Sequence, residues 1–317
     1  GCERAFESSF GCRMTGEEGA AATRCGYVAL IGAPNAGKST LLNQVVGTKV
    51  AIVTRKVQTT RTRIIGISVR GPVQMIFVDT PGIFAPRRRI DRAMVGAAWR
   101  GAQDADEIVV LVDAIRGMTE DTERIVAQLK VRGRQAVLAL NKVDAVKRPQ
   151  LLELASHLNE TGAFHEVFMI SALNGDGVGD LVEFLAARLP SGLWLYPEDQ
   201  LSDMTERLMA AEITREKIYE RLHQELPYQT AVDTENWQDQ DDGSARINQV
   251  IYVQSKSQRP IVLGKSGRTI KELGSLARAD MEQAFGRRVH LFLHVKVKPE
   301  WADDRDYYRA IGLEYPE

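Results

Sequence analysis

The most constraining feature of this 317-residue chain is a short glycine-containing loop near its N-terminal end. An apolar run, Tyr27 to Ile31, is followed at once by residues 32–39, whose sequence fits the pattern G-x-x-x-x-G-K-[ST]. In this pattern the glycines let backbone N–H groups converge on a phosphate, the lysine supplies positive charge, and the serine hydroxyl can ligate Mg²⁺. The loop therefore predicts a nucleotide-binding domain in which a buried strand leads into an apolar helix.

Further apolar runs recur along the first 190 residues, with amphipathic stretches between them. Runs this short, without polar alternation, are typical of strands buried on both faces of a parallel sheet. The alternation predicts an α/β doubly wound fold. Strands are expected at Tyr27–Ile31, Ile64–Val69, Val73–Val78, Ile108–Val112, Ala136–Leu140 and Val167–Ile170, and helices at Ala93–Gln103, Thr122–Arg132, Gln150–Asn159 and Val178–Leu189.

Ligand chemistry in such a sheet gathers at the carboxyl ends of the strands. The run that ends at Val78 is followed by Asp79-Thr80-Pro81-Gly82. Here the Asp can hold Mg²⁺ through water, and the Gly82 N–H can sense a γ-phosphate. Asp-x-x-Gly is also an ordinary turn sequence, so its position directly after a strand carries the inference.

The run that ends at Leu140 is followed by Asn141-Lys142-Val143-Asp144, which predicts the base. A carboxylate accepts hydrogen bonds from the N1–H and the exocyclic amine of guanine, whereas adenine offers it neither. A buried acceptor left unpaired costs about 1–3 kcal/mol, so Asp144 should reject ATP. The last run leads into Ser171-Ala172-Leu173, where a backbone N–H can donate to guanine O6; a polar strand end is the alternative interpretation.

Lys38, Asp79-x-x-Gly82, Asn141-Lys142-x-Asp144 and Ser171-Ala172 together resemble the boxes of the translation-factor-like GTPases. The resemblance implies a switch threonine between the loop and Asp79. The segment Gln58-Thr59-Thr60-Arg61 lies there, with Thr60 as first choice and Thr59 close behind; a polar loop before a strand is the alternative.

The same resemblance implies a role for each matching residue. Lys38, Thr60 and Gly82 would act in catalysis, and Ser39, Thr60 and Asp79 would hold Mg²⁺. GTP or GDP would be contacted by Gly32, Ala33, Pro34, Asn35, Ala36, Gly37, Lys38, Ser39, Thr40, Asp79, Thr80, Pro81, Gly82, Ile83, Asn141, Lys142, Val143, Asp144, Ser171, Ala172 and Leu173.

Ile83 departs from the Ras-type pattern, in which a Gln at this place orients the attacking water. A side chain without a donor or acceptor cannot do so, and slow intrinsic turnover is expected. Certain GTPases without that Gln use an Asn of the phosphate loop to help hold K⁺. Asn35 fits that role; a simple turn former after Pro34 is the alternative.

The second half of the chain has a different pattern. Helix-breaking residues 190–192 end the last helix, and we expect a tail at 1–23 that is partly non-native, a GTPase domain at 24–190, a linker at 191–202 and a second domain at 203–317. In this domain the pattern predicts a helix at Asp203–Leu226, strands at Gln229–Trp237 and Arg246–Ser255, a helix through Phe285, a strand at Val289–Val297, and a helix after Pro299.

Charge is segregated in this half. Residues 244–298 hold eleven Lys or Arg and three acids, which gives 11 − 3 = +8 in a chain whose formal charge is −1. Such segregation marks a candidate nucleic-acid surface. The alternative is that acids nearby in space, such as those of Asp239 to Asp242, balance it.

The order helix, strand, strand, helix, strand, with Gly264-Lys265-Ser266-Gly267 ahead of the second helix, resembles a type II KH domain, a small α+β fold. The resemblance implies that this G-x-x-G loop clamps about four nucleotides of single-stranded RNA. A helix-entry turn is the alternative. The RNA contacts would be Gly264, Lys265, Ser266, Gly267, Arg268 and Lys271.

A GTPase domain followed by a KH domain resembles the Era family of bacterial GTPases, from about Tyr27 to Gly312. Pro197-Glu198-Asp199 and Val295-Lys296-Val297-Lys298 support the resemblance. It implies binding to the 3′ end of 16S ribosomal RNA, a role in assembly of the small (30S) ribosomal subunit, and RNA binding favoured by GTP. It also implies a monomer in the cytoplasm with peripheral contact to the inner face of the cell membrane.

Composition limits the alternatives. With 44% hydrophobic and 26% charged residues, fibrous and wholly disordered chains are excluded. The cysteines, at positions 2, 12 and 25, are placed before the first expected strand, so the folded body has no disulfide framework. Two alternative functions remain. One is an RNA-binding module whose nucleotide only stabilises the fold, and Ile83 in place of Gln supports it. The other is a P-loop ATPase or kinase, and Asn141 and Asp144 argue against it.

Overall fold

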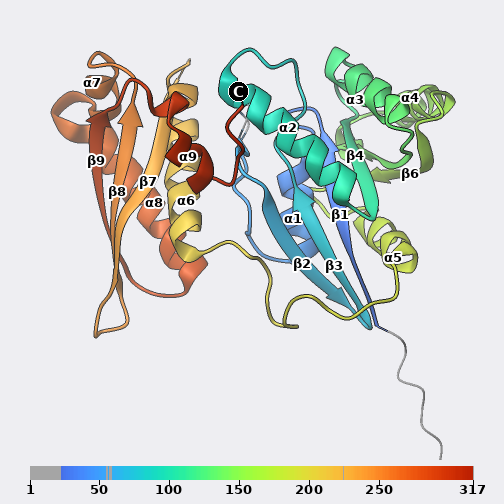
Figure 1. Cartoon of the computed structure of the whole chain (residues 1–317), viewed down its shortest axis with the longest axis horizontal. Coiled ribbons are helices and arrows are strands. Elements are labelled where there is room, and N and C mark those ends of the chain that lie inside the picture. The colour runs from blue at the N-terminus through green and yellow to red at the C-terminus, as the bar shows by residue number, and fades with distance from the viewer. Residues whose placement is uncertain (1–22, 55, 57–58, 224, 317) are drawn as a thin grey trace, which may run out of the picture.

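The computed structural model describes residues 23–54, 56, 59–223 and 225–316. Gln58, expected in the switch segment, lies outside the described residues. Figure 1 shows two layered bodies side by side, each built on its own sheet and joined by an irregular segment that runs beneath them.

The first body has a six-stranded sheet in the order β2-β3-β1-β4-β5-β6. β2 runs antiparallel to β3, and the other neighbours are parallel. β2 is antiparallel to β3 because the two-residue turn at residues 71–72 can join only antiparallel strands. The strands are β1 Arg24–Gly32, β2 Ile64–Arg70, β3 Val73–Asp79, β4 Glu107–Asp113, β5 Ala136–Asn141 and β6 Phe164–Ile170.

Helices cover both faces of this sheet, which confirms the doubly wound prediction. Alternate residues of β1 show the division: Val28 and Leu30 pack with α1 and α5, whereas Ala29 and Ile31 pack with α2 and α3. Cys25, expected before the first strand, is a buried residue of β1. The helices are α1 Lys38–Val46, α2 Arg89–Asp104, α3 Glu120–Val131, α4 Arg148–Glu160 and α5 Val178–Arg188, with a 3₁₀ turn η1 at Val143–Ala145.

The second body has a three-stranded sheet, β7-β8-β9, in which β8 is antiparallel to β7 and parallel to β9. α6 and α8 cover one face, as the type II KH prediction requires. The elements are α6 Glu206–Arg221, η2 Leu226–Gln229, β7 Thr230–Asp239, β8 Ala245–Val253, α7 Gln258–Leu263, η3 Lys265–Gly267, α8 Arg268–Phe285, β9 Val289–Val297, η4 Trp301–Asp303 and α9 Arg305–Ala310.

α7 was not predicted from the sequence. It has six residues, which is fewer than two turns and too short for a periodic apolar pattern to emerge. Pro260 also lies inside it, at a position near the helix start where proline is tolerated. The helix matters because it leads directly into the G-x-x-G loop.

The two bodies contact each other through more than the connecting segment. Ile90 and Met94 of α2 form an apolar cluster with Trp301 and Tyr308, which follow β9. The charged helix α6 is buried along most of its length, with residues 209–219 all below a tenth exposed. Trp194 and Tyr196 of the connecting segment pack against β2 and β3. The nucleotide half and the KH half therefore share buried surface.

Candidate functional site

The loop at the start of α1 is held in shape by protein contacts. Gly37 caps the helix with a φ of +99°, and a Cβ there would overlap the Asn141 amide nitrogen. The Lys38 ammonium is buried and donates to the carbonyls of Gly32 at 3.2 Å and Ala33 at 3.1 Å. Burial lowers the pKa of Lys38 to about 8, against the opposing attraction of Asp79. A phosphate would restore the charge that burial disfavours.

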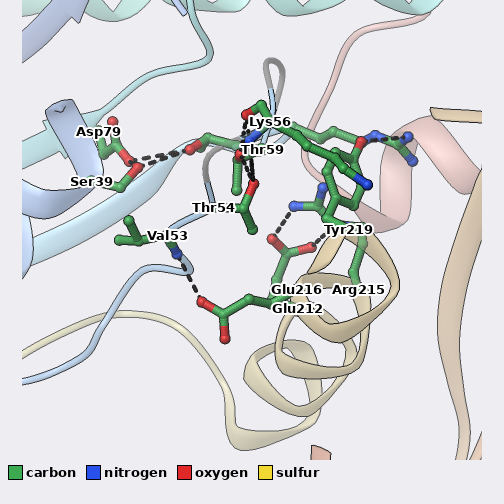
Figure 2. A network of polar contacts seen from close by, with 12 residues as sticks. Ser39, Val53, Thr54, Lys56, Thr59, Asp79, Glu212, Arg215, Glu216 and Tyr219 are labelled. Carbon is green, nitrogen blue, oxygen red and sulfur yellow. Dashed lines mark hydrogen bonds and ion pairs between the residues drawn. The ribbon is translucent and has the colours of Figure 1, made fainter. Parts of the chain in front are cut away.

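Three side chains meet at the end of this loop. Ser39 Oγ donates to Asp79 Oδ2 at 2.5 Å and lies 3.0 Å from Thr60 Oγ1. Thr60 Oγ1 also lies 3.4 Å from Asp79 Oδ2. Figure 2 shows Ser39 and Asp79 pointing toward each other from α1 and β3.

This corner fits a divalent cation. Asp79 Oδ1 is buried and accepts no hydrogen bond from the described residues. Burial raises the pKa of the Asp79 carboxyl to about 6, although Lys38 and Ser39 favour its charged form. A carboxylate with two hydroxyls is the oxygen ligand set that Mg²⁺ prefers, and the cation would compensate the buried negative charge.

The structure distinguishes the two candidate switch threonines. Thr60 faces Ser39 and Asp79, as described above. Thr59 turns the other way: its hydroxyl lies 2.7 Å from Thr54 Oγ1 and donates to the Lys56 carbonyl at 2.8 Å. The geometry therefore favours Thr60, the first choice from the sequence.

The Asp79-x-x-Gly82 turn lies directly on the phosphate loop. A Cβ on Gly82 would come within 2.9 Å of the Pro34 backbone nitrogen, so only glycine allows this approach. The next residue, Ile83, donates its backbone N–H to the Gly32 carbonyl at 3.0 Å, and its side chain is buried in the core. Ile83 thus serves packing, and its side chain does not replace the missing glutamine.

Asn141 joins three loops. Its Nδ2 donates to the Ala36 carbonyl at 2.8 Å, and its Oδ1 accepts the backbone N–H of Ala172 at 2.9 Å. The Ala172 N–H, an expected donor to guanine O6, thus bonds to Asn141 in this structure, while the Ser171 N–H donates to the backbone carbonyl of Asp176 at 2.9 Å. The Asp144 carboxylate is exposed, as is Leu173. The residues expected to contact the base are thus more open than the phosphate loop.

Lys142 has a left-handed backbone, with a φ of +69°, and its ammonium reaches back to the phosphate loop. It donates to the Asn35 carbonyl at 3.0 Å and pairs with Asp113 at 2.6 Å. Asn35 is itself left-handed, with a φ of +64°, which supports the turn-former interpretation without opposing a role in ion binding.

A cleft of about 780 Å³ runs over the loop and is lined by Pro34, Asn35, Gly37, Lys38, Ser39, Thr40, Thr60 and Gly82. Several other residues that line this cleft were not predicted from the sequence. Asp113 ends β4, so the strand-end rule could have found it. Tyr219 and Glu220 come from α6 of the other body, and no local signal could have placed them there.

The G-x-x-G loop lies between α7 and α8. Gly264 has a φ of +72°, and a Cβ there would overlap the Thr269 side chain. Gly267 caps the 18-residue helix α8 with a φ of +74° and has open space around its Cβ position. Lys265, Ser266, Arg268 and Lys271 are all exposed. The predicted RNA residues therefore share one accessible surface, with the exposed Ile261 of α7 as an apolar neighbour missed from the sequence.

The +8 segment is partly balanced in space, which corrects the charge argument. Arg287 pairs with Glu206 and Asp239, Lys296 with Glu235 at 2.7 Å, and Lys298 with Asp304. These acids lie outside residues 244–298. The basic side chains that stay exposed include several on or beside α7 and the start of α8: Lys256, Arg259, Lys265, Arg268 and Lys271. Positive charge is therefore concentrated around the G-x-x-G loop.

Comparison with known proteins gives the family. The family of 50S ribosome-binding GTPases matches residues 27–142, and the KH domain family matches residues 225–302. GTPase Era of Brucella suis biovar 1 is 56% identical over 301 residues, covering 95% of this chain and 97% of its own length. GTPase Era of Afipia carboxidovorans is 57% identical over 300 residues, with the same two coverages. The chain belongs to the GTPase Era family.

Solved Era structures agree over nearly the whole chain. A variant of Aquifex aeolicus Era bound to GDP and AlF₄⁻ superimposes with a TM-score of 0.86 at 36% identity. An Era in complex with MgGDPNP and nucleotides 1506–1542 of 16S ribosomal RNA gives 0.87 at 36% identity. Each match covers 92% of this chain and 99% of the other. This member of the Era family is accordingly a GTPase with a C-terminal KH domain. Among its described residues, no helix is long and apolar enough to cross a membrane.

Proposed function

We propose that this Era-family GTPase is a GTP-driven switch that binds the 3′ end region of 16S ribosomal RNA and acts in assembly of the small (30S) ribosomal subunit. One observation carries the proposal: Ser39, Thr60 and Asp79 meet beside buried Lys38, while the second body exposes a G-x-x-G loop at the start of α8. The related Era in complex with MgGDPNP and a 16S fragment supports this pairing of ligands.

The proposed division of the chain is a GTPase domain at 24–190, a linker at 191–202 and a KH domain at 203–317. Within the first domain, we assign Lys38 to the phosphates and Asp144 to guanine. Ser39, Thr60 and Asp79 would hold Mg²⁺, which supplies positive charge to the phosphates. Gly82 would place its backbone N–H toward the γ-phosphate. Gly264 to Gly267, Arg268 and Lys271 are assigned to RNA.

Intrinsic hydrolysis is proposed to be slow, because the Ile83 side chain is buried in the core and has no group that could orient water. A monovalent cation can supply part of the missing charge stabilisation. Asn35 lines the cleft, and we assign it to a K⁺ site. Hydrolysis should then be faster in K⁺ than in Na⁺ at matched ionic strength, and equal rates in the two salts would count against the assignment.

The rival function, an RNA-binding module with a structural nucleotide, predicts RNA binding that is indifferent to GTP. The deciding experiment uses the full chain loaded with GTP or GDP, crosslinked to RNA and followed by sequencing of the RNA. The switch proposal expects 16S 3′-end sequence enriched with GTP relative to GDP. Equal enrichment in both states would favour the rival, and enrichment of unrelated RNA would overturn the partner.

A matched pair of variants makes this experiment specific. Lys38→Ala should remove the difference between GTP and GDP while RNA binding itself persists, because the G-x-x-G loop belongs to the other sheet. Gly267→Asp should remove the crosslink in both states. Action in the cytoplasm as a monomer, with peripheral contact to the membrane, remains a prediction for fractionation and light scattering.

A further inference from the structure

Several of the described residues between α1 and β2 contact α6 of the KH half. The Glu216 carboxylate accepts the backbone N–H of Val53 at 2.9 Å and pairs with the Lys49 ammonium at 2.6 Å. Lys56 donates to the Leu222 carbonyl at the end of α6. Figure 2 shows Val53 on the segment directed toward Glu216 on the helix. The described residues that precede the switch segment are therefore docked on the RNA-binding half.

Arg61 is a buried residue of this contact. The whole residue is only 4% exposed, although arginine is rarely buried. It donates to the carbonyls of Thr230 at 2.8 Å and Tyr228 at 3.1 Å, and to the Tyr219 hydroxyl at 3.1 Å. It also lies 5.5 Å from the centre of the Trp301 ring. These partners all belong to the KH half.

The residue directly before Arg61 faces the other half. Thr60 Oγ1 lies 3.0 Å from Ser39 Oγ and 3.4 Å from Asp79 Oδ2, at the corner that fits Mg²⁺. Thr60 and Arg61 are adjacent in the chain. The Arg61 side chain is held in the KH half, whereas the Thr60 side chain lies at the metal corner. A planar guanidinium whose two terminal nitrogens donate to several fixed acceptors defines position more narrowly than a flexible ammonium does.

We propose that Arg61 is a positioning residue: by anchoring the switch segment in the KH half, it holds Thr60 at the metal corner, so that the RNA-binding half forms part of the scaffold for GTP hydrolysis. The inference rests on the proposed assignment of Ser39, Thr60 and Asp79 to Mg²⁺. It adds that the distance between the two halves sets the geometry of hydrolysis, and that a change at η2, β7 or η4 reaches the metal corner through one side chain.

The primary test is Arg61→Met in the full chain. We expect kcat for GTP hydrolysis to fall about tenfold and the Mg²⁺ concentration for half-maximal rate to rise severalfold. GDP affinity should stay within about twofold, because Arg61 does not line the phosphate loop. Arg61→Lys, which keeps the charge but not the fork of donors, should give intermediate values. Unchanged kcat and Mg²⁺ requirement in a folded Arg61→Met protein would overturn the proposal.

A double variant tests whether Arg61 acts through Thr60. If it does, adding Arg61→Met to Thr60→Ala should lower kcat by less than about twofold, because the group being positioned is already gone. Multiplied losses would mean that Arg61 acts by another route and would overturn the proposal. Lys49→Ala is the matched control: it removes a half-exposed contact of the same interface and should leave kcat near the unmodified value. An equal loss in this control would assign the effect to the interface as a whole.

Two further variants separate the possible failures. If Arg61→Met does not fold, Tyr219→Phe removes one acceptor and keeps the ring; it should lower kcat severalfold and raise the Mg²⁺ requirement, and normal values would overturn the proposal. Ser39→Ala tests the underlying assignment independently. If Ser39→Ala keeps a normal Mg²⁺ requirement, the metal corner itself is wrong. If Ser39→Ala loses Mg²⁺ response while Arg61→Met keeps it, only the role of Arg61 fails.

Discussion

Two glycine-containing loops in this chain each lead into a helix, and they are constrained in different ways. Gly37 and Gly267 both cap their helices with a positive φ, +99° and +74°. A Cβ on Gly37 would overlap the Asn141 side chain, whereas a Cβ on Gly267 would meet nothing within 4 Å. The first glycine is therefore required by the protein's own packing. The second is favoured by its backbone angle alone.

This difference extends to the charged groups beside each loop. Lys38 is buried and held by loop carbonyls, so its position is set before any ligand binds. Lys265 and Arg268 are exposed, and they would be ordered by the partner. A prearranged site avoids reorganisation when charge develops during a reaction. An open clamp suits a long, flexible ligand that is bound and released.

The largest expected effect tests the packed loop. Gly37→Ala combines a positive φ with an overlap on Asn141, and strain of about 3 kcal/mol should lower GDP affinity about a hundredfold. The measurement is titration with a fluorescent GDP derivative, with thermal unfolding in parallel. Gly47→Ala is the matched control, because Gly47 ends the same helix with a φ of +83° and open space. Equal losses in both variants would remove the packing argument.

The next effect tests the open loop. Gly267→Asp puts a carboxylate where a phosphate is proposed to approach, so RNA affinity should fall about a hundredfold while basal GTP hydrolysis stays within about twofold. Any stimulation of hydrolysis by an RNA that ends in the 16S 3′ sequence should also disappear. Gly243→Asp is the control: Gly243 has a φ of +80° and open space in the turn between β7 and β8. RNA stimulation that survives Gly267→Asp would mean that the loop is only a helix entry.

The features that could be predicted from the sequence are those that depend on neighbouring residues of the chain. The phosphate loop and the strand ends were predictable, because their function depends on residues adjacent in the chain and on a parallel sheet that gathers strand ends at one edge. Val289–Val297 was predicted with its observed bounds as β9, since strict alternation marks a strand covered on one face. The strand β2 was predicted at Ile64–Val69, but its antiparallel direction and the helix α7 were not, because both depend on very short segments.

The contacts between the halves were beyond reach of the sequence. Arg61 lies 158 residues before Tyr219 and 169 before Thr230, and its acceptors are phenols and backbone carbonyls that carry no charge pattern. The pairing of Arg287 with Asp239 fits the alternative given for the charge pattern, whereas the pairings of Lys296 with Glu235 and of Lys298 with Asp304 were not predicted, for the same reason. The spacing of residues within one loop predicts what that loop can bind. It does not predict which charged side chains pair with residues far away in the sequence.

A smaller effect concerns the exposed part of the nucleotide site. Asp144→Asn should lower GTP affinity about tenfold to a hundredfold and raise preference for xanthine nucleotides, because an amide can donate to a 2-oxo group that a carboxylate would repel. Competition between GTP and XTP measures the change. Asp180→Asn, on the exposed first turn of α5, is the control. Unchanged specificity in Asp144→Asn would place the base elsewhere.

The smallest expected effect separates charge at a distance from contact. Arg278 is exposed on α8, beyond the loop, and Arg278→Glu should lower RNA affinity about threefold at low salt, with the loss disappearing as salt screens the field. Lys298→Glu also reverses a charge outside the loop, but it is expected to change the stability of the fold as well as RNA affinity. Lys298 pairs with Asp304, and Asp304 caps α9 by accepting the Asp306 N–H at 2.9 Å.

Lys298→Glu should therefore lower the thermal unfolding temperature as well as RNA affinity, whereas Arg278→Glu should lower RNA affinity alone. The comparison is made by measuring binding across a salt series, with a melting curve for each variant. If the loss in Arg278→Glu persists at high salt, this arginine contacts RNA directly, and the clamp extends along α8 well past Lys271. If Arg278→Glu has no effect even at low salt, the long-range field of the KH half contributes nothing, and affinity comes from the loop and its immediate neighbours.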